Sequence, residues 1–287
     1  MRIGTWNINS VRARAERLAG VLERHDLDVL ALQETKCKDA QFPTQLVQEL
    51  GYEVAHVGLN QWNGVALISR VGLEEVRTSF PGQPGFAKDP AAPQEREARA
   101  VGARVGGPDG ITLWSLYVPN GRELTDRHYG YKLSWLRALA DYAEGFLAAS
   151  PGKLLFMGDF NIAPTDADVW DPSFFIGKTH VSEPERAAFQ RLVEVPLREV
   201  TRPLTGDGYT YWDYQAGRFP KDEGMRIDFQ LASPALAQLA TAAIIDKKER
   251  EVGSGERPSD HVPVIVDYEV PVPAAGSPVR ADSRAEA

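Results

Sequence analysis

Cysteine is almost absent from this sequence, which has a single one, Cys37, among its 287 residues. One cysteine cannot form a disulfide within the chain, and this fits a protein of a reducing compartment. No histidine stands beside Cys37 in an interpretable motif. We therefore interpret it as an ordinary small residue rather than as a nucleophile.

Long apolar runs are also absent. No stretch approaches the length needed to cross a membrane, and Met1 to Ser10 lack a basic segment followed by an apolar run. We expect a soluble, cytoplasmic, monomeric protein without membrane contact.

The chain has no excess of positive charge. Its formal net charge is −8 and its pI is about 5.3. This balance argues against binding of nucleic acid by bulk positive charge. It leaves room for a local basic groove, and an acidic metal site would itself add negative charge that a bound cation partly neutralises.

Common hydrolase and nucleotide-binding motifs are missing: there is no G-x-S-x-G, no H-E-x-x-H and no G-x-x-x-x-G-K-[ST]. Four histidines show no metal-ligand spacing, and we interpret them as surface or packing residues: His25, His56, His128 and His180.

What the chain has is enough apolar material, 43% of its residues, for one large core. Composition changes only near the end. We expect a single catalytic domain over residues 1–269 and a disordered tail over 270–287, which is rich in Pro, Ala, Ser and charge.

The apolar periodicity predicts more strands than helices. We expect strands near 2–8, 28–33, 52–57, 65–69, 73–79, 98–105, 111–117, 153–157, 210–214, 227–232 and 262–268. Helices are expected near 12–24, 44–50, 131–149 and 184–193, the last opened by a capping box of Ser182 and Glu185. Because strands and helices do not alternate regularly, the pattern favours two sheets with outer helices.

Polar residues follow or precede four of the buried-type strands, where a rigid scaffold can aim them. Each has an ordinary structural interpretation alone, such as a turn for Asp159 and Asn161 or a packed core residue for His261. Together they offer oxygen ligands for a hard cation, a carboxylate for water, and a donor for a phosphoryl oxygen. The set is Asn7, Asn9, Glu34, Asp159, Asn161, Asp260 and His261.

These residues resemble the motifs of the endonuclease/exonuclease/phosphatase superfamily, in family order. The matching segments are Trp6–Ala13, Leu32-Gln33-Glu34-Thr35-Lys36, Tyr117–Gly121, Gly158-Asp159-Phe160-Asn161, Arg226–Phe229 and Ser259-Asp260-His261. The second segment is specific for the DNA repair branch, the exonuclease III group. The resemblance implies an α/β (α+β) fold, a four-layer αββα sandwich with two mixed β-sheets flanked by helices.

The resemblance also implies a Mg²⁺ cofactor, with Mn²⁺ as an alternative and either one or two metals. Glu34 would be the principal ligand, with Asn7 and Asp260 nearby. Two departures from some relatives affect the site: Asn9 stands where they have Asp, and Met225 stands where they have Trp.

The catalytic roles implied by the resemblance involve five residues. Asp159 would orient or deprotonate water, or alternatively protonate the leaving oxygen. Asn161 and Tyr117 would hold the scissile phosphate. Asp228 would orient His261, which would donate to a non-bridging phosphate oxygen.

The expected substrate is double-stranded DNA with abasic sites or 3′ ends. The resemblance implies that Tyr211, Met225 and Ile227 line an apolar pocket that admits a baseless sugar, with Trp212 beside it. Tyr211 and Trp212 can equally form the packing face of a strand. Further substrate contacts are expected from Lys36, Arg99, Asn120 and Arg122, although each cation could be a solvated surface charge.

Two rival functions remain at this point. One is a phosphoesterase of the same superfamily that acts on a phosphoinositide or another non-DNA phosphodiester. The other is a DNA-binding module that has lost catalysis, which the intact motif set disfavours. We predict incision 5′ to abasic sites, which leaves a 3′-hydroxyl, and removal of nucleotides or blocking groups from 3′ ends.

Overall fold

The computed structural model describes residues 1–149, 152–253 and 255–272, and in this part of the chain the strands form two six-stranded sheets. The first sheet has the order β11 (Ala240–Ile245), β12 (Val264–Tyr268), β1 (Arg2–Asn7), β2 (Val29–Gln33), β4 (Val65–Ser69) and β3 (Glu53–Val57). The second has the order β5 (Glu74–Arg77), β6 (Ala100–Val105), β7 (Ile111–Tyr117), β8 (Leu154–Asp159), β10 (Asp228–Ala232) and β9 (Arg198–Glu199).

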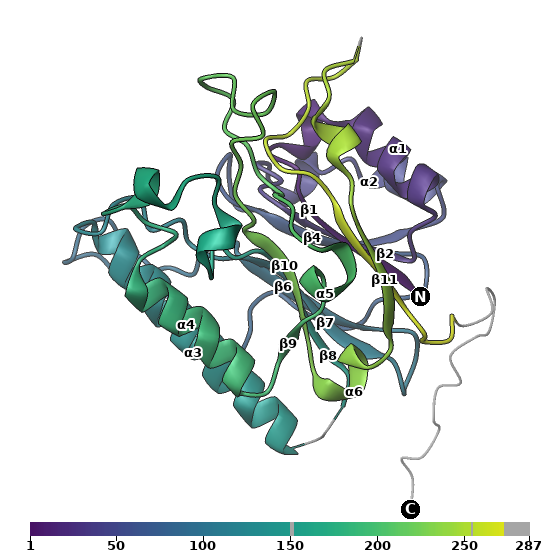
Figure 1. The fold of residues 1–287 in the computed structure, drawn as a ribbon. Helices are drawn as coiled ribbons and strands as arrows, with labels where there is room; N and C mark the ends of the chain where they lie inside the picture. Colours follow the sequence, from purple (N-terminus) through teal and green to yellow (C-terminus); the bar gives the residue numbers. More distant parts are fainter. Residues whose placement is uncertain (150–151, 254, 273–287) are drawn as a thin grey trace, which may run out of the picture.

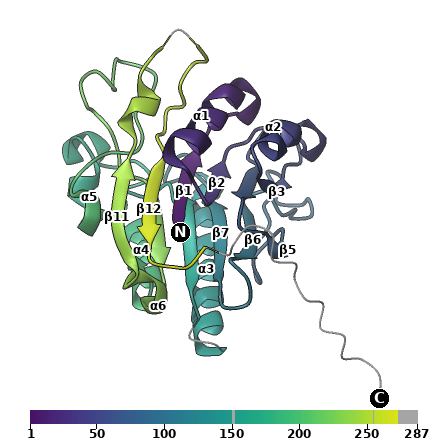
Figure 2. The ribbon, with the colours of Figure 1, turned by 90° about the vertical axis from the view of Figure 1, so that its right-hand side faces the viewer.

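Helices cover the outer face of each sheet. Figure 1 shows α3 (Arg127–Ala149) and α4 (Glu183–Glu194) side by side on one side of the strands, and α1 (Ala15–His25) and α2 (Thr44–Glu49) on the other. The view in Figure 2 agrees with this arrangement. Two one-turn helices, α5 (Arg202–Thr205) and α6 (Pro234–Ala237), and short 3₁₀ turns at Val11–Ala13, Asp39–Gln41, Asp166–Asp168, Pro172–Phe175 and Lys247–Arg250 complete the connections.

Three apolar layers separate these four layers of secondary structure. Residues such as Ile3 of β1 and Leu113 of β7 pack between the two sheets. Leu18 of α1 packs with Leu32 of β2 on one outer face, and Trp135 of α3 packs with Phe156 of β8 on the other. The predicted αββα sandwich is therefore confirmed, because each sheet buries one face against its partner and the other against helices.

One predicted strand is absent from the structure, and the elements β9, α5 and β11 were not predicted. Residues 210–214 do not form a strand: Tyr211 makes only isolated bridges to Met225 and His261. The strand β11 was not predicted, because its alanine-rich sequence lies at the edge of the sheet with most side chains partly exposed. Such a strand has little apolar alternation to reveal it.

Strand direction brings distant parts of the sequence to one edge. β1 runs parallel to β2, and β7 runs parallel to β8, so the carboxyl ends of each pair lie together. β12 is antiparallel to β1, and β10 is antiparallel to β8 with Asp228 opposite Asp159. The starts of β10 and β12 therefore lie beside the ends of the parallel strands, where the polar motifs were predicted.

The packed domain extends slightly beyond its predicted end. Val270 is buried against the layer between the sheets, and its carbonyl oxygen accepts a hydrogen bond from the Met1 amino group at 3.1 Å. The rest of the predicted tail from residue 273 lies outside the described residues. Within the described residues, no helix has the length and apolar character needed to cross a membrane.

Candidate active site

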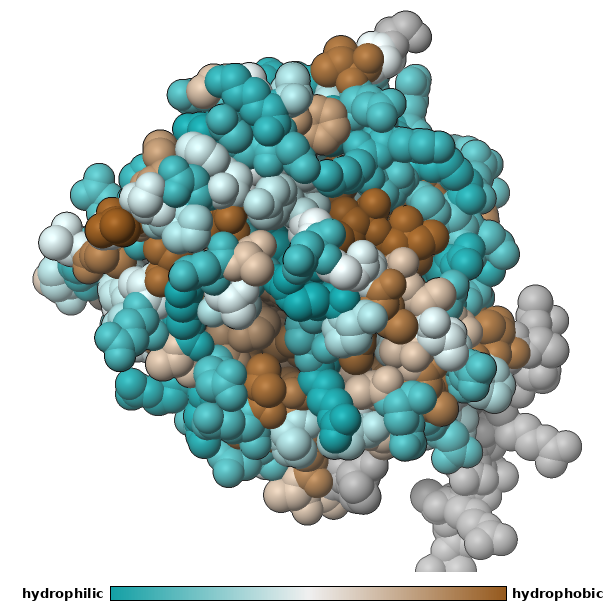
Figure 3. Space-filling model, in the orientation of Figure 1, coloured by the Kyte–Doolittle hydropathy of each residue, from teal (hydrophilic) through white to brown (hydrophobic). Residues whose placement is uncertain are grey.

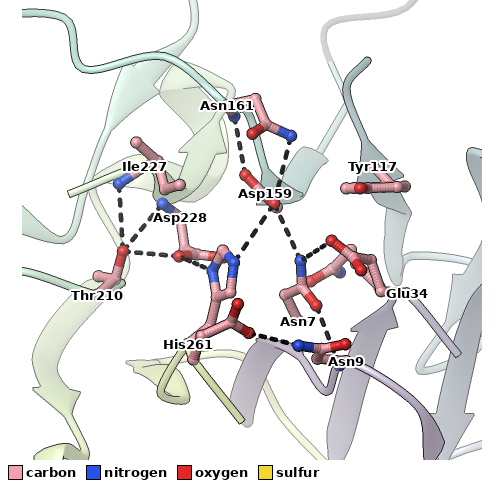
Figure 4. A network of polar contacts seen from close by, with 12 residues as sticks. Asn7, Asn9, Glu34, Tyr117, Asp159, Asn161, Thr210, Ile227, Asp228 and His261 are labelled. Atoms are coloured by element: carbon pink, nitrogen blue, oxygen red, sulfur yellow. Dashed lines mark hydrogen bonds and ion pairs between the residues drawn. The ribbon is translucent and has the colours of Figure 1, made fainter. Parts of the chain in front are cut away.

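Asp159 lies at the centre of the polar edge (Figure 4). It is the last residue of β8 and is 1% exposed. Its Oδ1 accepts a hydrogen bond from the main-chain N–H of Asn161 at 2.8 Å, and its Oδ2 accepts one from Asn7 Nδ2 at 3.0 Å. The two sheets thus meet at this carboxylate, since Asn7 ends β1 of the other sheet.

Gly158, just before Asp159, has a φ of +147°, which favours glycine. A Cβ at this position would lie 1.9 Å from the Leu116 carbonyl oxygen of the neighbouring strand. We expect Gly158→Ala to lower the free energy of unfolding by about 1–3 kcal/mol through backbone strain alone, with the steric overlap adding to this. Urea denaturation would check this, and an unchanged midpoint would contradict the expectation.

His261 lies between two carboxylates. Its Nδ1 is 2.9 Å from Asp228 Oδ2, and its Nε2 is 3.8 Å from Asp159 Oδ2. The same Asp228 oxygen accepts a hydrogen bond from the hydroxyl of Thr210 at 2.6 Å. Asp228 and Thr210 therefore fix the ring so that Nε2 faces Asp159, and the role of Thr210 was not predicted from the sequence.

Burial and neighbouring charges shift the pKa values of Asp159 and His261. Burial, together with the nearby charges of Asp228 and Glu34, raises the pKa of Asp159 to about 7. Burial alone would lower the pKa of His261, but the charges of Asp228 and Asp159 outweigh it and raise this pKa to about 10. The geometry therefore favours a protonated imidazole between the carboxylates, which is suited to donate a proton or a hydrogen bond.

A second polar group lies around Glu34, which follows β2. Its Oε1 accepts a hydrogen bond from Asn7 Nδ2 at 3.0 Å, and its Oε2 lies 2.6 Å from Lys36 Nζ. Burial alone would raise the Glu34 pKa, but Lys36 and Asn7 lower it below its usual value. Asn9 accepts from Lys36 and donates to Asp260 Oδ1 at 2.9 Å, which joins Asp260 to the group.

These residues have the oxygen ligands that a divalent cation site requires. Glu34, Asn7 and Asp260 offer carboxylate and amide oxygens, the ligands that hard cations prefer. The ammonium group of Lys36 forms an ion pair with Glu34. The Glu34 carboxylate therefore already attracts one positive charge. Asp159, Asp228 and His261 could also hold a metal by distance, since one ligand atom from each lies within 4.8 Å of the others.

Asn161 and Asn120 form a pair beside Asp159. Asn120 Nδ2 donates to Asn161 Oδ1 at 3.1 Å, and Asn161 Nδ2 donates to the Val118 carbonyl oxygen at 3.0 Å. His180 Nε2 lies 3.1 Å from the same Asn161 oxygen. His180 is therefore a buried packing residue, as one of the two predicted interpretations has it, but its contact with Asn161 was not predicted. Its only sequence signal was its place just before the capping box that starts α4.

Tyr117 and Arg99 lie together at the end of β7. The Arg99 guanidinium lies 4.8 Å from the Tyr117 ring centre and pairs with Glu97 at 2.6 Å. Burial and the charge of Glu34 raise the Tyr117 pKa well above its usual value, so its hydroxyl remains a donor. Arg99 is buried, and in this arrangement it supports the Tyr117 ring rather than facing solvent.

The predicted apolar pocket residues lie beside His261. The Tyr211 and His261 ring centres are 4.9 Å apart, and Tyr211, Met225 and Ile227 belong to one apolar cluster. Met225 also lines a cavity of about 670 Å³ together with Arg122 and His180.

Trp212 requires a correction. It is fully buried, its indole N–H donates to Asp222 at 3.1 Å, and its ring packs edge-on against Phe219. We therefore assign it to packing beneath the site rather than to direct contact with substrate.

On the face shown in Figure 3, hydrophilic side chains predominate, and the coloured apolar residues form separate groups. Arg122 is about half exposed, with its side chain at 50%, and Lys36 is partly exposed, at 29%. Asn120 is exposed as well, whereas Arg99 is buried, so solvent reaches three of these four predicted substrate contacts.

Comparison with known proteins identifies the family. Residues 4–261 match the model of the Endonuclease/Exonuclease/phosphatase family. The chain is 29% identical to exodeoxyribonuclease III of Haemophilus influenzae, over 93% of this chain and all of that protein. The structure of the 3′ phosphatase NExo from Neisseria, bound to a product DNA hairpin, is 34% identical with a TM-score of 0.84, over 94% of this chain and all of that one. An AP endonuclease from Archaeoglobus fulgidus is 29% identical with a TM-score of 0.84, over 94% and all of the two chains.

The fold and the site define a metal-dependent phosphoester hydrolase, and Asp159, Asp228 and His261 lie close enough together to hold a metal. The chain belongs to the Endonuclease/Exonuclease/phosphatase family. The resemblance inferred from its motifs is confirmed, as is its predicted class, a hydrolytic nuclease.

Proposed function

We propose that this chain, a DNA repair nuclease, uses Mg²⁺ to hydrolyse phosphoester bonds in duplex DNA. Its substrates are an abasic site, incised on the 5′ side, and a 3′ end that carries a nucleotide or a blocking phosphate. Each reaction breaks a bond between phosphorus and a 3′ oxygen and leaves a 3′-hydroxyl, so one site serves all three.

The observation that carries the proposal is the meeting of Asp159 with residues from both sheets. Asp159 lies within hydrogen-bonding distance of Asn7 and 3.8 Å from His261, although Asn7 and His261 are 254 positions apart in the sequence. A buried carboxylate, a cationic imidazole and paired amides around one point match the needs of phosphoryl transfer, which are water activation and neutralisation of developing charge.

We assign roles to the residues as follows. Asp159 orients and accepts a proton from the attacking water. His261, held by Asp228 and Thr210, donates to a non-bridging phosphate oxygen. Asn161 and Tyr117 hold the scissile phosphate, with Asn120 beside them.

We propose Glu34, Asn7 and Asp260 as the metal ligands. They supply oxygen atoms only, whereas Nδ1 of His261 is already engaged with Asp228. When bound there, Mg²⁺ would neutralise charge on the phosphate as a Lewis acid.

Metal removal gives the direct test. We expect the purified protein to incise a duplex with one synthetic abasic site in the presence of Mg²⁺, and to lose this activity in excess EDTA. Restored Mg²⁺ should recover it, because the ligands belong to the folded protein. Cleavage that EDTA leaves unchanged would refute the metal assignment, and an undamaged duplex with blocked 3′ ends serves as the control.

A parallel duplex with a 3′-phosphate tests the second substrate class. We expect Mg²⁺-dependent release of inorganic phosphate from it. Failure on both DNA substrates would refute the proposed function.

The rival activity on phosphoinositides is not favoured. The relatives that cover nearly the whole chain are nucleases, an AP endonuclease and a DNA-bound 3′ phosphatase. Tyr211, Met225 and Ile227 belong to one apolar cluster, and the Tyr211 and His261 ring centres are 4.9 Å apart. We propose that this apolar side of the site receives a baseless sugar next to the scissile phosphate. The monomeric state, the cytoplasmic location and a disordered tail stay predictions.

A further inference from the structure

A buried lysine lies beneath the two asparagines of the site. Lys132 of α3 and Glu185 of α4 are both fully buried, and their Nζ and Oε1 atoms are 2.5 Å apart. The Nζ also donates to the main-chain carbonyl oxygens of Asn161, at 2.6 Å, and Asn120, at 3.2 Å. One ammonium group thus joins the segments after β7 and β8 to the start of α4.

The polar contacts of this pair are complete. Lys132 has three N–H donors, and it has three acceptors: Glu185, Asn161 and Asn120. Glu185 Oε1 also accepts from the Thr179 hydroxyl, at 2.7 Å. Apolar residues of similar volume often stabilise a core as well as a buried ion pair does. Stability alone therefore does not account for this pair, and geometry is the alternative reason for it.

The backbone of Asn161 needs such support. Its φ is +51°, in the left-handed region that residues other than glycine rarely adopt. The carbonyl oxygen of Asn161 accepts from Lys132, while its side-chain oxygen accepts from Asn120 Nδ2 at 3.1 Å. Lys132 thus donates hydrogen bonds to the main chains of Asn120 and Asn161, whose side-chain amides are hydrogen-bonded to each other.

The loop after β7 packs closely against the side chain of Lys132. Gly121 has a φ of +91°, and a Cβ there would lie 3.2 Å from Lys132 Cδ and 2.8 Å from Thr179 Oγ1. The loop is therefore packed directly on the methylene groups of Lys132. A shift of this side chain would displace Gly121 and, with it, the neighbouring Asn120.

We propose that Lys132, held by Glu185, is a positioning residue that sets the distance and orientation of the Asn120 and Asn161 amides for the scissile phosphate. The inference rests on the proposed function, because that function assigns the phosphate to these amides. Lys132 acts through the asparagines and touches no reacting atom.

A double-mutant cycle tests this coupling. Lys132→Met keeps the length of the stem and removes the donors, and we expect it to lower kcat on the abasic duplex by on the order of 10²-fold with little change in KM. In an Asn120→Ala/Asn161→Ala background the same substitution should leave the residual kcat unchanged, since no amide remains to be positioned. An equal loss of kcat in both backgrounds would overturn the proposal.

Two further variants guard against a trivial loss of folding. Glu185→Gln is nearly isosteric, removes the partner charge and replaces one accepting oxygen with an NH2 group. It should lower kcat in the same way, again without effect in the double-alanine background. Arg17→Met removes a cation paired with Glu249, at 3.1 Å between α1 and the 3₁₀ turn Lys247–Arg250. We expect it to retain kcat.

A spectroscopic measurement separates this inference from the proposed function. The side-chain amide NMR signals of Asn120 and Asn161 should shift or broaden in Lys132→Met, whether or not the protein cleaves DNA. Wild-type protein that cleaves neither DNA substrate would refute the proposed function alone. Unchanged amide signals in the folded Lys132→Met variant would refute the positioning role.

Discussion

Asp159→Asn is expected to lower kcat on the abasic duplex by roughly 10²–10⁴-fold, the range that positioned acid–base groups contribute. An asparagine at position 159 keeps an oxygen that can accept a hydrogen bond from the main-chain N–H of Asn161. Its neutral amide cannot take a proton from water. Thermal unfolding should show no loss of stability, because the substitution removes a buried carboxylate whose charged form is disfavoured there. Single-turnover kinetics with saturating enzyme measure the chemical step directly.

Asp28→Asn is the matched control for this variant. Asp28 is also buried, but it lies just before β2, at the opposite end of that strand from Glu34, and it pairs with Arg70 at 2.8 Å. We expect Asp28→Asn to lower stability and leave kcat unchanged. A near-normal rate in Asp159→Asn would show that its assigned role is wrong.

His261→Asn is expected to lower kcat by roughly 10²–10³-fold, the usual cost of losing one donor to a developing anion. Here stability should fall as well, by roughly 3–5 kcal/mol, since Asp228 would be left buried without its cationic partner. Kinetics must therefore be measured at a temperature where circular dichroism shows the variant folded. The double variant Asp228→Asn/His261→Asn should recover stability but not kcat, because the donor remains absent.

His25→Asn provides a similar histidine–carboxylate pair away from the site. His25 Nε2 lies 2.7 Å from Asp246 Oδ2, and the His25 carbonyl oxygen accepts from Arg2 at the start of β1. We expect this variant to keep its kcat. A wild-type rate in folded His261→Asn would exclude the donor role of His261.

The parts of the fold that the sequence predicted are those with strong local patterns. The run Val29–Leu32 and the pattern of Leu154–Met157 are apolar on both faces and indicated buried strands, which the structure has. Ser182 and Glu185 formed the expected capping box at the start of α4. The strand β11 escaped prediction because its alanine-rich sequence carries no such pattern.

The site was predictable where side-chain chemistry coincided with strand ends. Asn7, Glu34, Asp159 and His261 were recognised in this way, and the structure brings them together. The contacts of Lys132 and His180 were missed. Nothing local distinguishes a helical lysine, and the only signal for His180 was its place just before a capping box. Their contacts with Asn161 join residues 29 and 19 positions apart.

The sequence by itself determined the apolar layers, the strand ends and the kinds of ligand and proton donor that reach them. Tertiary structure decided which groups share a carboxylate, which histidine is cationic, and which lysine supports the asparagines. The physical reason is that burial and partner charges, which set the pKa values and orientations of these groups, exist only after the two sheets have packed.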